Sequence, residues 1–279
     1  MVKPTVNTLT TTTEESGLSM KGIKARTGLL INGCSLSIDS ADDALHTNAS
    51  MYINAGTFEL ASGDDALHAD ESLVIADGNI HISTSYEGIE GLTVVISGGT
   101  VDLVASDDGI NAAGGVDTSG STGGRDGMFG GYPTISNGNG SVQITGGTIQ
   151  VNASGDGIDV NGTLVISGGT TTVMGPTQGD TATLDYDTSA TITGGTFIDT
   201  GASNMAQTFS NASQGVVSVS VGNQTAGTEI RLTDASGNST FSFAPAEAYQ
   251  VIILSSPELV SGETYTSQIG TQTHTVSAK

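Results

Sequence analysis

The feature that most constrains this chain is an acidic pentapeptide that recurs at a nearly constant spacing. It occurs first as Asp42-Asp43-Ala44-Leu45-His46 and returns, unchanged and 22 residues later, as Asp64-Asp65-Ala66-Leu67-His68. Altered copies follow as Tyr86-Glu87-Gly88-Ile89-Glu90, as Asp107-Asp108-Gly109-Ile110-Asn111 and, after an insertion, as Gly155-Asp156-Gly157-Ile158-Asp159. A fixed period of about 22 residues predicts a solenoid, in which residues one period apart stack on one another.

Apolar residues recur with the same period, and they predict the kind of solenoid. Alternation of apolar and polar residues is typical of strands, and Gly-Gly pairs are typical of turns. The leucine-rich repeat consensus, the 18-residue coil of hexapeptide helices and the calcium-binding nonapeptide are all absent. We therefore expect an all-β fold, a right-handed parallel β-helix of about seven coils. Its three apolar ladders contain Ile31, Ile53, Ile75, Ile96, Ile144, Ile166 and Ile192; Leu36/Ile38, Phe58/Leu60, Ile80/Ile82, Val101/Leu103 and Ile149/Val151; and Leu45, Leu67, Ile89, Ile110 and Ile158.

The repeat also divides the chain. We expect an N-terminal extension over residues 1–18 and the β-helix over 19–214, with a glycine-rich insertion at 113–140 that leaves the helix just after an acidic motif. The period is lost in residues 215–279, where short strands alternate with Gly, Pro and Asn. This C-terminal β module either caps the open end of the solenoid, which would otherwise be an unpaired edge, or forms a separate sandwich-like domain.

The composition limits the partners. With 29 acidic and 7 basic residues, the formal net charge is -22, which argues against binding to nucleic acid or to an anionic membrane surface. No stretch is long and apolar enough to insert into a membrane, and none reads as a signal peptide. The Lys-poor, Thr- and Asn-rich surface favours a secreted or cell-surface protein, which we expect to be a monomer. The single Cys34 allows no internal disulfide, and we expect it to be buried in the core.

The second acidic position of each motif predicts a ladder of carboxylates. Strands in a sheet lie about 4.8 Å apart, so like charges stacked at that spacing repel by a few kcal/mol per pair. Ca²⁺, which takes six to eight oxygen ligands, fits such a site better than Mg²⁺. The alternative is that Asp and Asn merely favour the turn through bonds to the backbone. The candidate metal ligands are Asp42, Asp43, Asp64, Asp65, Glu87, Glu90, Asp107, Asp108, Asn111, Asp156 and Asp159.

The last position of the motif forms a mixed row. His46 and His68 stack on each other there, following Lys24 and preceding Glu90. We expect these histidines to be exposed polar residues beside the calcium sites, and a zinc site of His and Glu is the weaker alternative. Tyr86 falls at the acidic face, where it could stack on a sugar ring. The candidate ligand-binding residues are Tyr86, Arg125, Tyr132, His46 and His68.

Signals for catalysis are weak, and we assign no catalytic residue. Eliminative cleavage of a uronate polymer requires a base that removes the C5 proton. Lys24 lies on the motif row and Arg125 lies in the insertion, so these two are the candidate bases of a lyase. Paired Asp residues could also serve a hydrolase, but a calcium shell would occupy the stacked carboxylates.

The motifs together resemble a known family. The run from Gly22-Ile23-Lys24 through the first four pentapeptides, above all Ser85-Tyr86-Glu87-Gly88-Ile89-Glu90-Gly91, and the tail from Pro245 to Tyr265 are similar to bacterial carbohydrate-binding-domain-containing proteins with a polysaccharide-lyase-like, or pectate-lyase-like, β-helix. The fifth motif, at Gly155-Asp156, departs from the family pattern. The resemblance implies a calcium-carrying β-helix that binds plant cell-wall polysaccharide, with acidic pectic chains as the first candidate and cellulose as a second, without established catalysis. It carries the calcium-ligand role onto Asp42, Asp43, Asp64, Asp65, Glu87, Glu90, Asp107 and Asp108. The alternatives are a pectate-lyase-like enzyme and a structural or adhesive surface solenoid.

Overall fold

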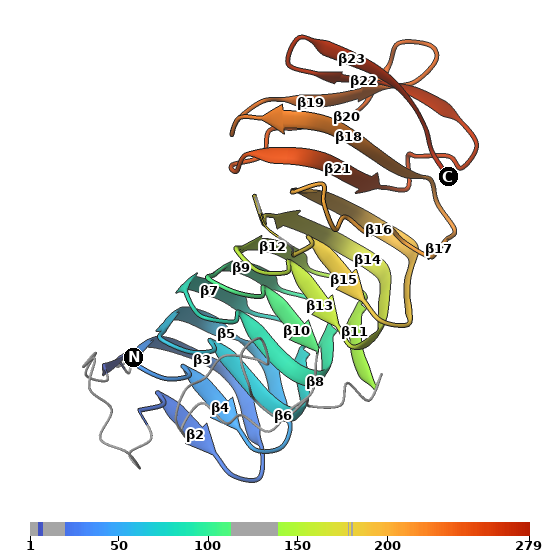
Figure 1. Cartoon of the computed structure of the whole chain (residues 1–279). Coiled ribbons are helices and arrows are strands. Elements are labelled where there is room, and N and C mark those ends of the chain that lie inside the picture. The colour runs from blue at the N-terminus through green and yellow to red at the C-terminus, as the bar shows by residue number, and fades with distance from the viewer. Residues whose placement is uncertain (1–4, 8–19, 113–138, 178, 180) are drawn as a thin grey trace.

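A computed structural model of the chain describes residues 5–7, 20–112, 139–177, 179 and 181–279. The described residues contain strands and no helix, and they form a β-solenoid of about seven turns followed by a C-terminal antiparallel sheet. Figure 1 shows the turns stacked from the N-terminal end toward the C-terminal module. The prediction of an all-β solenoid is thus confirmed. Arg125 and Tyr132 lie outside the described residues.

Each full turn contains three strand segments, and equivalent segments pair in parallel to form three columns. Column 1 contains the strands that follow the acidic motifs: β2 (Ile23–Ala25), β4 (Leu45–Thr47), the start of β6 (Leu67–Ile75), the start of β8 (Ile89–Ile96), β10 (Ile110–Ala112), β13 (Ile158–Val160) and β15 (Leu184–Tyr186).

Columns 2 and 3 share several long strands that bend at a corner. Column 2 contains the first halves of β3 (Leu29–Ser40), β5 (Met51–Ser62), β14 (Gly162–Met174) and β16 (Ser189–Gly201), the ends of β6 and β8, and also β11 (Gly140–Ile144) and β17 (Asn211–Ala212). Column 3 contains β1 (Thr5–Asn7), the second halves of the long strands, β7 (Asn79–Thr84), β9 (Thr100–Ala105) and β12 (Thr148–Ala153).

The predicted apolar ladders form the interior. In column 2, Ile31 pairs with Ile53 and the register continues to Ile192 without exception. The other two ladders also lie in register, and nearly all their members are at most 7% exposed. At the corner between columns 2 and 3, Gly99 has φ +81° and lies so close to Gly78 that a Cβ atom would come within 2.6 Å of its carbonyl oxygen. Glycine is therefore required there.

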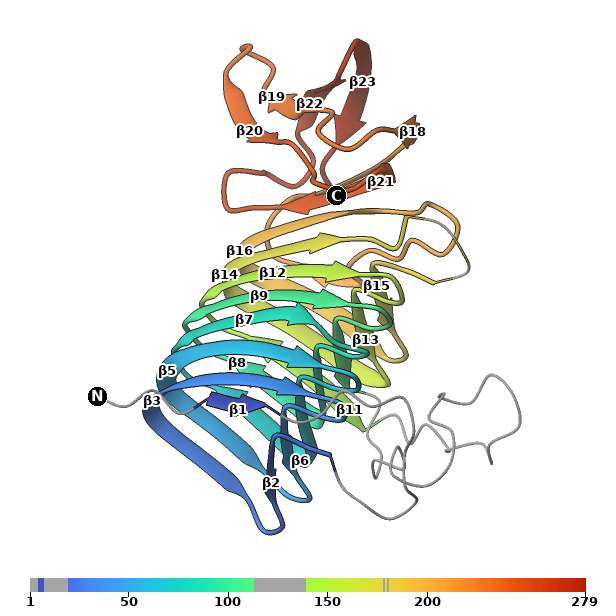
Figure 2. The same ribbon diagram turned by 90° about the vertical axis from the view of Figure 1, so that its left-hand side faces the viewer.

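The C-terminal module continues the solenoid at its last turn. β21 (Tyr249–Ser255) pairs antiparallel with β16 on one side and with β18 (Val216–Gln224) on the other. A second antiparallel sheet contains β19 (Ile230–Thr233), β20 (Ser239–Phe243), β22 (Thr264–Ile269) and β23 (Gln272–Ser277). Figure 2 shows β21 lying along β16 at the top of the stack. The module therefore covers the edge that the last turn would otherwise leave open.

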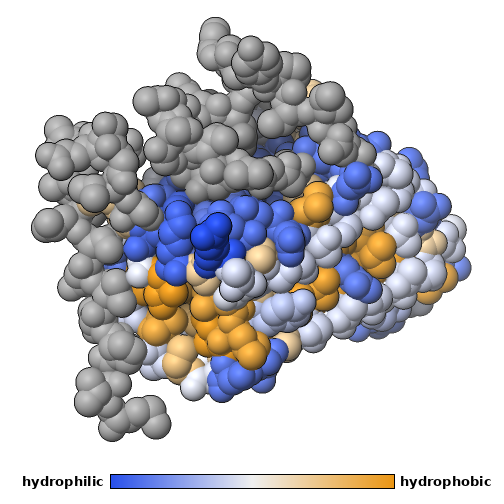
Figure 3. Space-filling model, turned by 90° about the horizontal axis from the view of Figure 1, so that it is seen from below, coloured by the Kyte–Doolittle hydropathy of each residue, from blue (hydrophilic) through white to orange (hydrophobic). Residues whose placement is uncertain are grey.

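The N-terminal end of the stack shows an apolar surface. Figure 3, which looks onto this end, shows apolar side chains gathered there beside a strongly hydrophilic group. Leu30 is 60% exposed, and Cys34 is exposed as well. The expectation of a buried Cys34 is wrong, because Cys34 lies at a corner of the first turn, where the register shifts next to Gly33 (φ +102°). An open hollow here is lined by Ile23, Leu29, Leu30, Ile31, Asn32, Gly33, Cys34 and Leu36.

Candidate functional site

The acidic motifs form the loops that connect column 3 to column 1. Backbone hydrogen bonds lock each of these acidic loops to the next, because the carbonyl oxygen of every ladder carboxylate residue accepts an N–H from the preceding turn. The donors are Gly22 to Asp43 (2.8 Å), Ala44 to Asp65 (3.0 Å), Ala66 to Glu87 (3.0 Å), Gly88 to Asp108 (3.0 Å) and Gly109 to Asp156 (2.9 Å). These five acidic residues, here called the carboxylate ladder, therefore stack as the repeat predicts.

The ladder is buried to an unusual degree for carboxylates. Asp43 is 0%, Asp65 5% and Glu87 3% exposed, while Asp108 and Asp156 are half-buried. Ionised carboxylates in such places need a compensating charge or hydrogen bonds. The five positions meet this need in different ways, and the difference divides the ladder into an N-terminal and a C-terminal part.

In the first turns a lysine supplies the positive charge. Lys21 Nζ lies 2.6 Å from Asp43 Oδ2 and 2.8 Å from Asp42 Oδ1, and its side chain is only 4% exposed. Asp43 Oδ2 also contacts His46 Nδ1 at 2.7 Å. Burial opposes ionisation of Asp43, yet the bond from His46 and the charge of Lys21 hold its pKa below the usual value. Asp42, Asp43 and Asp64 are close enough to share an ion, but Lys21 already occupies two of them.

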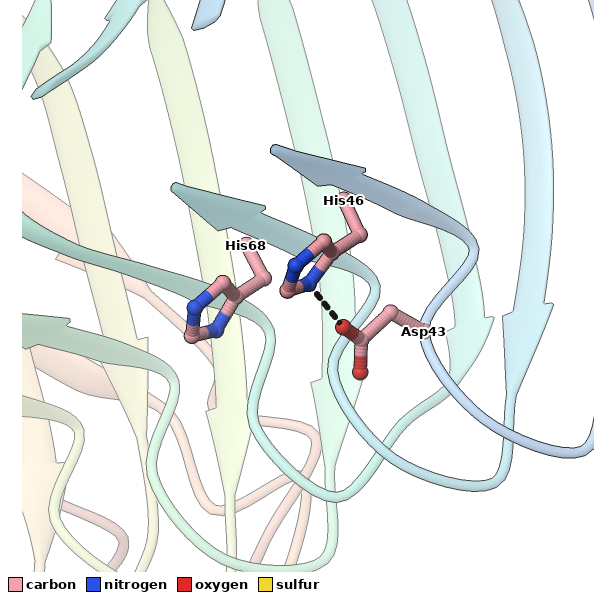
Figure 4. Close-up of side chains that lie close together, drawn as sticks. All are labelled: Asp43, His46 and His68. Atoms are coloured by element: carbon pink, nitrogen blue, oxygen red, sulfur yellow. Dashed lines mark hydrogen bonds and ion pairs between the residues drawn. The ribbon is translucent and has the colours of Figure 1, made fainter. Parts of the chain in front are cut away.

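The two histidines are not exposed, and this corrects the expectation from the sequence. His46 and His68 are each 1% exposed, and their rings stack with centroids 4.8 Å apart and planes 9° from parallel. Figure 4 shows the two rings side by side, with Asp43 bonded to His46. The register of the row is confirmed, since Lys24, His46, His68 and Glu90 pair in sequence. Asp43 and Asp65, three residues before the histidines in the acidic loops, bond to these buried rings.

His68 lies among three carboxylates. Its Nδ1 is 3.1 Å from Asp65 Oδ2 and also contacts Glu90 Oε2 of the next turn, while its Nε2 is 3.0 Å from Asp70 Oδ1. Burial disfavours the charged ring, but the bonds to Asp65 and Glu90 outweigh burial and raise the pKa of His68 to about 12. Burial, with the repulsion of Glu90 and Asp43, raises the pKa of Asp65 well above its usual value.

Glu87 has an amide as its partner. Asn111 Nδ2 donates to Glu87 Oε2 at 2.9 Å. Asn111 and Glu87, both candidate calcium ligands, are therefore hydrogen-bonded to each other. Burial, followed by the charges of Asp65, Glu90 and Asp108, raises the pKa of Glu87 well above its usual value. A single neutral hydrogen bond does not offset three neighbouring acids.

The C-terminal part of the ladder brings carboxylate oxygens together, and no lysine or arginine of the described residues is among the main groups acting on Asp108 and Asp156. Asp108, Asp156 and Asp159 each place a carboxylate oxygen within 4.8 Å of the others. Burial, reinforced by Asp156, raises the pKa of Asp108 to about 8, and burial raises that of Asp156 to about 6. Among the described residues, the groups acting on these two carboxyls are other carboxylates and backbone N–H groups.

A glycine shapes this part of the site. A Cβ atom at Gly155 would come within 2.5 Å of both Asp107 Oδ1 and Asp108 Oδ1, so the two oxygens converge over a position that carries no side chain. Oxygens bound to one Ca²⁺ lie at most about 5 Å apart, because each is about 2.3 to 2.6 Å from the ion. The side chains of Asp108, Asp156 and Asp159 therefore lie close enough together to share a calcium ion, and Asp107 lies beside them at Gly155.

The other sequence candidates are placed less centrally. Tyr86 is half-buried in the acidic loop between Asp64 and Asp107, to which its backbone is bonded. Lys24 is exposed at the start of column 1. The roles proposed for both residues remain predictions.

Several residues of the site were not predicted from the sequence. Lys21 stands one period before Asp43, so the 22-residue spacing could have predicted its place on the ladder. Asp70 lies two residues after His68, so the alternation of a strand could have predicted that both lie on the same face. Asp199 could not have been found: it is 0% exposed, it accepts a 2.7 Å bond from Thr183 Oγ1, and burial raises its pKa to about 7. Nothing in its sequence context marks it.

Comparisons with known proteins bear on the function of this face. The family model described as carbohydrate-binding domain-containing protein matches residues 2–66 and 51–125. The two matches overlap, together cover less than half of the chain, and include four of the five acidic motifs. They support a carbohydrate-binding role. No curated protein and no solved structure matches the chain. In the part of the chain that the structure describes, no helix is long and apolar enough to cross a membrane.

Proposed function

We propose that the chain is a non-catalytic, calcium-dependent binder of acidic polysaccharide, in particular of the pectic chains of plant cell walls. The observation that carries the proposal is the grouping of Asp108, Asp156 and Asp159 carboxylate oxygens within 4.8 Å of one another. Asp107 lies beside them at Gly155. Among the described residues, the main groups acting on Asp108 and Asp156 are acids and backbone N–H groups. The family match supports carbohydrate as the ligand. Asp108, Asp156 and Asp159 would hold the ion, and the ion would supply positive charge to the C-terminal part of the ladder.

The charge of the protein gives calcium a second role. At a net charge of -22 the protein repels a polyuronate, so such a chain can approach only where the local field is reversed. Calcium ligands are completed by water and by oxygens of any source. A calcium ion held at the half-buried Asp108 and Asp156 can therefore also bind a uronate carboxylate. We expect a secreted or cell-surface location for a protein with this ligand.

Affinity electrophoresis tests the proposal. The protein is run through gels containing polygalacturonate, with CaCl2 or with EGTA, beside gels containing hydroxyethylcellulose as a neutral β-glucan. We expect retardation by polygalacturonate with calcium only, and its loss in Asp108→Asn/Asp156→Asn. The matched control Glu59→Gln/Glu263→Gln removes the same charge from exposed positions elsewhere and should be retarded like the wild type. Equal retardation with EGTA would refute calcium bridging.

A further inference from the structure

The N-terminal part of the ladder contains a group of possible metal ligands that includes a nitrogen atom. We propose that His68 Nδ1, Asp65 and Glu90 bind a first-row transition-metal ion of the Zn²⁺ class, with Asp70 orienting the imidazole. The three ligating groups come from two consecutive turns, and their atoms lie within 4.8 Å of one another. This inference is independent of calcium binding at Asp108 and Asp156.

The contacts of His68 require a positive charge at Nδ1. The two ring nitrogens have different neighbours: Nε2 faces Asp70 at 3.0 Å, while Nδ1 faces oxygens of both Asp65 and Glu90. In the absence of metal, a proton on Nδ1 supplies this charge and bonds to Asp65 and Glu90. A metal ion at Nδ1 would displace that proton and supply the charge instead, through coordination bonds to His68, Asp65 and Glu90.

The spacing of the ligands suits a small ion. Zn²⁺ binds imidazole nitrogen at about 2.0 to 2.1 Å and carboxylate oxygen at about 2.0 to 2.2 Å, so tetrahedral ligands lie about 3.4 Å apart. The distance of 3.1 Å between His68 Nδ1 and Asp65 Oδ2 is close to that value. Glu90 Oε2 lies closer to Nδ1 than that, so the Glu90 side chain would have to move outward to share the ion. Imidazole nitrogen favours Zn²⁺, Cu²⁺ or Ni²⁺, whereas Ca²⁺ prefers oxygen ligands.

The surroundings of His68 match those of metal-bound histidines. A ligating imidazole usually donates its other N–H to a carboxylate, which fixes the ring and makes the ligand more basic. Asp70 has that position, and Asn48 Nδ2 in turn donates to Asp70 Oδ2 at 3.2 Å. The ring is thus held from both sides, and at 1% exposure it is shielded from water.

The neighbouring His46 provides an internal contrast. Its Nδ1 also faces a carboxylate, Asp43, but the Lys21 ammonium lies 2.6 Å from that same Asp43 oxygen and supplies the charge. Ligand atoms of Asp43, His46 and His68 also lie within 4.8 Å of one another. The two rings are nearly parallel, however, so their in-plane lone pairs point in similar directions, and Asp43 is already paired with Lys21. These contacts favour a metal at Asp65, His68 and Glu90 over one between the two rings.

Isothermal titration of the chelator-treated full chain with ZnCl2, in buffer with excess CaCl2, tests the site. We expect one zinc ion to bind per chain. The zinc affinity should fall at least tenfold in His68→Gln and in Glu90→Gln, and also at least tenfold in Asp70→Asn. The control His81→Gln alters a histidine that also pairs with an acid, Asp102 at 3.1 Å, but whose side chain is 44% exposed. His81→Gln and Asp108→Asn/Asp156→Asn should bind zinc like the wild type.

A second measurement avoids substitutions that could disturb folding. Nitrogen NMR of the imidazoles in the wild type should show Nδ1 of one histidine shifting on addition of Zn²⁺, with Nε2 still protonated. If the titration shows no heat of zinc binding, or if His68→Gln and Glu90→Gln both bind zinc like the wild type, the proposal is overturned. A zinc-induced shift confined to exposed His81 would overturn it equally.

Discussion

The residues of the carboxylate ladder have different partners. Asp43 has Lys21 and His46, Asp65 has His68, and Glu87 accepts a bond from the neutral amide of Asn111. Asp108 and Asp156 have backbone N–H groups and each other. Because the backbone stacks these residues regardless of charge, ionised carboxylates in the C-terminal part of the ladder repel one another. The same substitution should therefore have opposite effects at its two ends.

Asp43→Asn and Asp108→Asn test this contrast in the absence of metal. Asp43→Asn removes one of the two carboxylates paired with the buried Lys21, and we expect the free energy of unfolding to fall by about 3 kcal/mol. Asp108→Asn removes a carboxyl that burial and Asp156 disfavour, and we expect unchanged or higher stability. Urea unfolding in EGTA at neutral pH measures both. A loss at Asp108 as large as that at Asp43 would contradict uncompensated charge in this part of the ladder.

Metal-free stability should also depend on pH in a defined direction. The pKa of Asp108 is raised to about 8 and that of Asp156 to about 6, against about 3.9 in an unfolded chain. A carboxyl whose pKa rises on folding retains its proton in the folded state after the unfolded chain has lost it. The contribution of these two carboxyls to the free energy of unfolding should therefore fall between about pH 4 and pH 8. The two shifts together set an upper bound of about 8 kcal/mol, which solvent screening of these half-buried groups reduces.

Urea unfolding across this range, in EGTA and in CaCl2, checks the pH dependence. Calcium at Asp108 and Asp156 would compensate the charges that form as pH rises, so the decline should be much shallower with calcium. Identical profiles in both buffers would show that calcium does not bind these carboxylates.

At the scale of the elements, most of the architecture could be predicted from the sequence. The three apolar ladders lie in register because a period-2 pattern repeated every 22 residues leaves only one way to bury Ile53, Ile75 and Ile96 together. The loops were harder. Apolar periodicity does not predict the path of an acidic loop, so the burial of His46 and His68 was not predicted. The exposure of Cys34 depends on a local register shift. The stacking of the carboxylates was predictable, whereas their individual partners depend on side-chain directions that the repeat does not encode.

The pairing of β21 with β16 predicts that the C-terminal module protects the solenoid. A chain ending at residue 214 would leave the backbone N–H and C=O groups of Phe197–Gly201 unpaired and would uncover Ile198. Exposed edges of this kind pair with other chains. We expect the shortened chain to associate or aggregate, as measured by size-exclusion chromatography with light scattering. A monomer that melts like the full chain would contradict a capping role.

At the scale of the whole molecule, a strongly acidic solenoid carries a face whose carboxylates are aligned at the strand spacing. The net charge of -22 keeps polyanions away unless metal ions intervene. Polymer ligands with repeating carboxylates match a repeating protein surface, and the family match points to carbohydrate. These features make calcium-dependent recognition of acidic polysaccharide the central claim.

Calorimetric titration with oligogalacturonate is the most direct test of that claim. The free acid and its fully methyl-esterified form are each titrated into the protein, in CaCl2 and in EGTA. The ester has the same sugar backbone without charge, so it serves as the matched ligand. We expect binding of the free acid in calcium and none in the other three conditions. Binding of the free acid in EGTA, or equal binding of the ester in calcium, would contradict a calcium bridge between the protein and the uronate.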